Sequence, residues 1–191
     1  MQVEDEKTKT KTKIKIKKIV FAILIIINCI VIFNFSNKVA DDSSEQSGRI
    51  VNFISQIIPS IKNMPEPNKT NFMEGTLTTI VRKTAHFSIY TLLGLLSMNF
   101  MITFKEKEFY KIDLRCLTTL TFCIFYAISD EFHQYFIPGR SCELRDVCID
   151  TLGAILGILV TKTVTKTVAK IYRNTRKAKN ITTWQINKTR V

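Results

Sequence analysis

Residues 129–140, SDEFHQYFIPGR, place two carboxylates, a histidine and an arginine directly after a long apolar run. Ionisable side chains are costly at membrane depth, where they usually face a protein interior or a wet cavity. The stretch therefore predicts one wall of a functional site at the end of a membrane helix. Whether a complete site forms there depends on where the other polar residues of the chain fall.

The apolar residues of this 191-residue chain are gathered in blocks bounded by Lys, Arg and short polar residues. Four blocks, 19–35, 76–104, 114–133 and 145–168, have the character of membrane spans. Segment 50–61 places its apolar residues on one helical stripe but is too short to cross a bilayer. We expect an all-α polytopic membrane protein with four transmembrane helices and a short interfacial amphipathic helix.

The spans divide the chain into an arm, a membrane domain and a tail. Residues 1–18 predict a solvated basic arm, 19–168 the transmembrane domain, and 169–191 a basic tail. Between the first two spans, 36–75 predicts an extracytoplasmic loop that contains helix 50–61, which Pro59 interrupts. A signal peptide is the alternative for the first span. However, the run exceeds a typical signal-peptide core and no small-residue cleavage site follows it, so an uncleaved anchor is expected.

The net charge of +12 is concentrated beside the apolar runs. The four-span topology puts 20 Lys and Arg residues on the inner side and six in the outer loops, so both termini are predicted to be cytoplasmic. The basic clusters abut spans and are not interleaved with aromatic residues on a folded module. Membrane lipids are therefore the expected partners, and nucleic acid is not.

This topology brings the start of span two, the end of span three and the start of span four to the same membrane face. Polar side chains from these three helix ends are expected to form a ligand-binding cluster. Its members are Arg82, Lys83, His86, Tyr90, Asp130, Glu131, His133, Gln134, Arg140, Asp146 and Asp150. Two plainer alternatives remain open, namely charges that reach the headgroups and an internal ion-pair network that only joins the helices.

Several functions of this cluster and of the helices around it are candidates. His86, His133 and Asp130 are the catalytic candidates for an enzyme that acts on a phosphorylated lipid, with arginines binding the phosphate. The histidines lie on different helices and form no H-E-x-x-H pattern, so neither a metal site nor a cofactor is predicted. Gly153 and Gly157 form a close-packing stripe on span four, through which a homo-oligomer can form.

The combined motifs resemble the VanZ-like family of small bacterial membrane proteins. They are R-K-x-A-H-F at 82–87, S-D-E-x-H-Q at 129–134 with P-G-R at 138–140, and D-x-x-x-D-T-x-G at 146–153. The resemblance covers about residues 20–165. It implies a bacterial cytoplasmic-membrane protein associated with low-level resistance to lipophilic glycopeptides such as teicoplanin.

We therefore expect a VanZ-like cell-envelope protein with an extracytoplasmic polar pocket. Its ligand would be an anionic lipid headgroup, a lipid-linked precursor or a lipoglycopeptide antibiotic. The alternatives are an intramembrane enzyme that acts on a phosphorylated lipid or precursor, and a structural or assembly factor in which the polar residues only fix helix packing.

Overall fold

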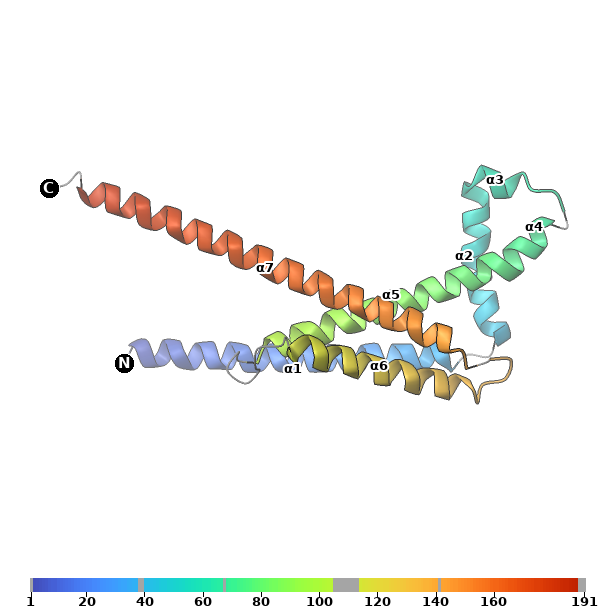
Figure 1. The fold of residues 1–191 in the computed structure, drawn as a ribbon, viewed down its shortest axis with the longest axis horizontal. Coiled ribbons are helices and arrows are strands. Elements are labelled where there is room, and N and C mark those ends of the chain that lie inside the picture. The colour runs from blue at the N-terminus through green and yellow to red at the C-terminus, as the bar shows by residue number, and fades with distance from the viewer. Residues whose placement is uncertain (1, 38–39, 67, 105–113, 141, 189–191) are drawn as a thin grey trace. The chain divides into compact units, whose positions relative to one another are not determined.

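The structure is a computed structural model that describes residues 2–37, 40–66, 68–104, 114–140 and 142–188. All regular secondary structure in these ranges is helical (Figure 1). The long helices are α1 (Gln2–Ser36), α5 (Thr78–Ile102), α6 (Leu114–Gln134) and α7 (Leu144–Lys188). The chain forms two compact units, Met1–Ile158 and Leu159–Val191, and all further contacts described are within the first.

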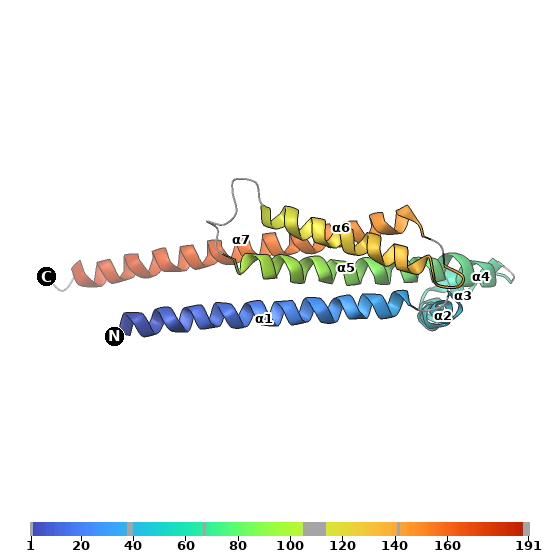
Figure 2. The ribbon, with the colours of Figure 1, turned by 90° about the horizontal axis from the view of Figure 1, so that it is seen from below.

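Four helices of the first unit pack along one another. The α1 and α6 helices run in one direction, whereas α5 and the first turns of α7 run in the other (Figures 1 and 2). Their shared core is formed by Ile32, Tyr90, Leu93, Cys123, Ala127 and Ala154, which come from all four helices. The end of α1, the start of α5, the end of α6 and the start of α7 consequently lie at the same end of the unit.

Three helical segments have the length and composition to cross a membrane: Thr8–Ser36, Asn68–Ile102 and Leu144–Lys177. The first and third contain the predicted spans 19–35 and 145–168, and the second contains all but the last two residues of the predicted span 76–104. The fourth predicted span coincides with α6, which is not among the three because its last turns carry Asp130, Glu131 and His133. The protein is thus all-helical with three candidate membrane-spanning helices.

The predicted loop 36–75 contains more helix than the single segment 50–61 that was expected. Helix α2 (Ala40–Ile57) begins ten residues before the predicted helix at 50–61, and α3 (Pro59–Lys62), α4 (Asn68–Asn71) and the π-helix η1 (Phe72–Leu77) follow. Ser47 and Val51 of α2 are buried. The helix therefore extends N-terminally beyond the apolar stripe that the sequence shows. The connector 105–111 lies outside the described residues.

Proline ends α2 as predicted. Ile58 has an extended backbone and Pro59 occupies the first turn of α3, where a proline costs no hydrogen bond. Within α2 the predicted apolar stripe faces outward, with 65% of Phe53 and 62% of Ile57 exposed, whereas its last residue, Ile61, is buried in α3.

Small residues let α5 and α7 approach closely. A methyl group built on Gly153 would collide with the backbone of Phe87, and one built on Gly157 would meet the backbone of Thr91 and Leu95. From the other side, Gly94 lies against the backbone of Ala154. The glycine stripe is thus in contact with a helix of the same chain, and the homo-oligomer stays a prediction.

Candidate functional site

A tight turn delivers the predicted residues of α6 and α7 to the same end of the bundle. Helix α6 ends at Gln134, and the chain reverses through Gly139, whose φ of 75° is readily adopted only by glycine. Arg140 is held in this turn because its backbone N–H donates to the carbonyl of Ile137. The Glu131 carboxylate then accepts the N–H of Glu143 at 3.1 Å, next to the positive end of α7.

A small polar cavity lies between the ends of α5, α6 and α7. Its volume is about 10 Å³, close to the space that one water molecule needs. It is lined by Arg82, Lys83, His86, Glu131, Gln134, Arg140, Asp146, Ile149 and Asp150. In this conformation the cavity has room for one water or a single ion. A larger ligand therefore has to bind at its mouth or open it.

Lys83 is neutralised by carboxylates from the other side of the cavity. Its Nζ forms an ion pair with Asp146 at the start of α7 and lies 3.6 Å from Glu143. The ion pair with Asp146 is half-buried, so it joins α5 to α7 more firmly than an exposed pair would.

Two arginines approach each other at the same cavity. Arg140 donates to the Gln134 side-chain oxygen at 3.0 Å. Burial and the neighbouring Arg82 guanidinium lower the pKa of Arg140, because both disfavour its charged form. Arg82 makes no hydrogen bond or ion pair with any described residue. The guanidinium of Arg82 therefore borders the cavity without a counter-ion among the described residues.

Beneath the arginines, a histidine and two carboxylates from three helices come together. Asp130 is 5% exposed and accepts hydrogen bonds at Oδ2 from Ser36 at 2.8 Å and Gln134 at 3.2 Å. Asp150 is 1% exposed, and its Oδ2 lies 4.0 Å from His86 Nδ1. One ligand atom from each of His86, Asp130 and Asp150 lies within 4.8 Å of the others, so this group can hold a metal ion.

Three of the predicted residues do not line the cavity, namely Tyr90, His133 and Asp130, of which Asp130 belongs to the group just described. Tyr90 is fully buried in the helix core, one turn deeper than His86. The ring of His133 stacks on Phe33 of α1 with centroids 4.6 Å apart. Of the two catalytic candidates that are histidines, only His86 lines the cavity.

The sequence analysis missed Ser36 and Glu143 as parts of the site. Ser36 is fully buried and binds Asp130, which is 94 positions away in the chain. The sequence does contain a signal for Ser36. A polar residue at the end of the first apolar run has to reach the same membrane face as the end of the third apolar run. Glu143 supplies a second carboxylate to Lys83 and also binds the exposed Arg145 at 2.9 Å.

The comparisons with known proteins show the family of this chain. The family model described as VanZ/LLP1 matches residues 21–165. The chain belongs to the VanZ/LLP1 family. The matched range contains the α1, α5, α6 and α7 residues that surround the site, from Ser36 to Asp150. No curated protein and no solved structure matches the chain. This protein is accordingly a VanZ-like membrane protein, with the polar cluster inside its family region.

Proposed function

We propose that this VanZ/LLP1 protein binds an anionic group of an envelope lipid, a lipid-linked precursor or a lipoglycopeptide at the polar cavity. Through that binding it would contribute to low-level teicoplanin resistance. The observation that carries the proposal is the convergence of Arg82 and Arg140 at one cavity, with Arg82 lacking any described counter-ion. Guanidinium groups bind phosphate and carboxylate through paired N–H donors.

The contacts around the arginines support anion binding over a purely structural ion-pair network. In such a network each cation would be matched by a carboxylate, as Lys83 is by Asp146. Arg82, in contrast, forms no ion pair with a described carboxylate. An anion at the mouth of the cavity would neutralise both guanidinium groups and would relieve their mutual repulsion.

The topology that goes with this proposal places the cavity on the extracytoplasmic face. Helices α1, α5, α6 and α7 would each cross the bilayer, with both termini in the cytoplasm. The distribution of Lys and Arg supports this orientation. Helix α2 would lie in the outer interface with Phe53 and Ile57 in contact with lipid, as the exposure of these side chains favours.

The test is the resistance phenotype of charge variants that insert normally. R82A and R140A should each abolish the increase in teicoplanin tolerance that the wild-type protein confers. R82K should restore it only in part, because lysine keeps the charge but loses the paired donors. R145A is the matched control, since Arg145 is exposed and binds Glu143 outside the cavity. Immunoblots of membrane fractions establish equal insertion, and full tolerance in R82A would refute the proposal.

A second candidate function is catalysis on a phosphorylated lipid. It is favoured by the position of His86, which lines the cavity 4.0 Å from Asp150, as a base oriented by a carboxylate would be. Purified protein incubated with envelope lipids should then convert one of them, and H86Q should not. Unchanged lipids in the wild-type reaction would exclude this function and leave binding in place.

A further inference from the structure

The inner group of the site, His86, Asp130 and Asp150, contains buried carboxylates whose negative charge the arginines do not compensate. Asp150 is 1% exposed, and its Oδ2 accepts no hydrogen bond from any described residue. The nearest candidate, His86 Nδ1, is 4.0 Å away, beyond the roughly 3.2 Å of an ordinary hydrogen bond. Buried carboxylates are stable when they are paired, hydrogen-bonded or bound to a metal.

Asp130 adds a second carboxylate to the same place. Its described hydrogen bonds, from Ser36 and Gln134, both end at Oδ2 and come from neutral donors. No described Lys or Arg nitrogen lies within 4.0 Å of either Asp130 or Asp150. Two buried carboxylates on different helices repel each other unless a cation or a proton lies between them.

The geometry fits a cation. Two ligands that bind one ion at about 2.1 Å lie up to about 4.2 Å apart. The 4.0 Å between His86 Nδ1 and Asp150 Oδ2 falls within that limit. Asp130 contributes a third ligand atom, with all three atoms within 4.8 Å of one another. The group is slightly wider than that limit at most, so its side chains would draw closer together around an ion.

The surroundings supply the supporting contacts that metal ligands usually have. Ser36 and Gln134 fix the Asp130 carboxylate from behind, as outer hydrogen bonds orient the ligands of known metal sites. The cavity of about 10 Å³ beside His86 and Asp150 has room for one water as a further ligand. Tyr90 lies one helical turn from His86, and its buried hydroxyl also lacks a described partner.

We propose that His86, Asp130 and Asp150 form a binding site for one divalent transition-metal ion. The ligand set is one imidazole nitrogen with two carboxylates, which suits Zn²⁺ or Mn²⁺, whereas Mg²⁺ and Ca²⁺ prefer oxygen ligands alone. The sequence analysis predicted no metal, because the three ligands come from three helices and match no local motif. This site goes beyond the anion binding proposed above and does not depend on it.

The ion would also complete the electrostatics of the cavity. It would neutralise the inner carboxylates and leave Arg82 and Arg140 free to attract an anion from outside. The arginines and the ion would then attract the same negatively charged group from two sides.

Metal content of the full-length protein in detergent micelles tests the proposal. Protein stripped with EDTA is dialysed against Zn²⁺, Mn²⁺, Mg²⁺ or Ca²⁺ and analysed by mass spectrometry of the elements and by thermal unfolding. We expect about one Zn²⁺ or Mn²⁺ per chain and a higher Tm with that ion. H86Q, D130N and D150N should each weaken binding by at least about tenfold. E74Q, which changes an exposed carboxylate of η1 outside the group, should bind as the wild type does.

The outcomes separate metal binding from folding and from anion binding. Gel filtration and helical circular dichroism identify variants that fold. Without metal, D150N should be at least as stable as the wild type, because it removes an uncompensated buried charge. If D150N does not fold, H86Q decides the question. Wild-type protein that binds none of the four ions, or H86Q that binds like the wild type, would overturn the site. R82A should keep the metal even where it loses anion binding.

Discussion

Ser36 joins the first helix to the site through one buried hydrogen bond. Its hydroxyl donates to Asp130 at 2.8 Å, and neither side chain is accessible to water. The Gln134 amide reaches the same carboxylate oxygen at 3.2 Å and Ser36 at 3.3 Å. Ser36 of α1 and Gln134 of α6 thus hold Asp130 in one orientation.

S36A should lower the free energy of unfolding by about 1 kcal/mol, the usual contribution of a side-chain hydrogen bond between membrane helices. S88A is the matched control, because the exposed Ser88 hydroxyl only bonds the Thr84 carbonyl of its own helix. The measurement is unfolding in mixed micelles at increasing dodecyl sulfate. Equal effects of the two substitutions would mean that Ser36 contributes nothing through Asp130.

At the scale of helices, the distance between α5 and α7 decides whether the site exists. Gly153 lies one turn after Asp150 and touches the backbone of Phe87, one residue after His86. A larger residue here would push α7 outward and carry Asp150 away from His86. Close packing of small residues is what lets polar groups from two membrane helices meet.

G157A should destabilise the protein by about 1–3 kcal/mol, the usual cost of forcing extra atoms into a packed interface. The added methyl group would lie 2.7 Å from the backbone nitrogen of Leu95, which cannot rotate away. G48A is the control, because nothing lies within 4 Å of that position, and alanine there should be neutral or slightly stabilising. Unfolding of both variants is compared in the same micelles, and a neutral G157A would contradict the observed contact.

Helix α2 presents its apolar side outward. The buried residues Val51 and Ser55 face the protein, whereas Phe53 and Ile57 are exposed. An exposed apolar stripe beside a membrane domain fits a helix that lies in the bilayer interface.

Tryptophan fluorescence tests the placement of α2. In a W184F background, F53W in vesicles should have blue-shifted emission that brominated lipids quench strongly. N52W is the comparison, because Asn52 lines a polar groove toward α4 and η1 instead of the exposed stripe. Equal quenching at both positions would rule out an interfacial α2.

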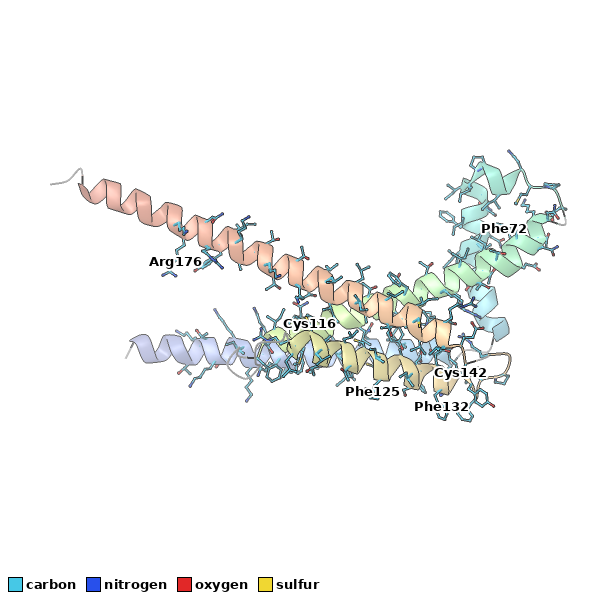
Figure 3. The ribbon with its side chains drawn as sticks, viewed as in Figure 1. Phe72, Cys116, Phe125, Phe132, Cys142 and Arg176 are labelled. Atoms are coloured by element: carbon cyan, nitrogen blue, oxygen red, sulfur yellow. The ribbon has the colours of Figure 1, made fainter. Side chains whose placement is uncertain are left out.

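At the scale of the whole protein, the topology depends on whether α6 crosses the membrane. Its site-forming end carries ionisable residues, yet its outer face is apolar, with 68% of Phe125 and 63% of Phe132 exposed (Figure 3). Such a face is suited to lipid. The proposed topology therefore requires α6 to cross the membrane with its polar end turned inward to α1 and α7.

Two native cysteines at opposite ends of α6 can test this topology. Cys142 lies in the exposed turn after α6, and Cys116 lies in its first turn (Figure 3). In single-cysteine variants on intact cells, an impermeant maleimide should label Cys142 at once and Cys116 only after permeabilisation. Labelling of both from outside would mean that α6 does not cross. Labelling of Cys116 alone would invert the orientation.

The sequence by itself determined the helices and the residues available to the site. Apolar runs and prolines act locally, so the limits of α5 and α6 and the break at Pro59 could be predicted closely. The family motifs also indicated the VanZ-like class, which the match over residues 21–165 confirms. The helix was expected to begin at residue 50, but α2 begins at Ala40, because its polar first turns show no apolar periodicity.

Only the tertiary structure decided which polar residues meet. Helical spacing puts Arg82, His86 and Tyr90 on one face, but packing sends Tyr90 into the core and leaves the other two at the cavity. The grouping of His86 with Asp130 and Asp150 depends on the rotation and depth of three helices, and close glycine contacts fix α5 against α7. Those quantities arise from contacts between distant segments, so no local pattern encodes them.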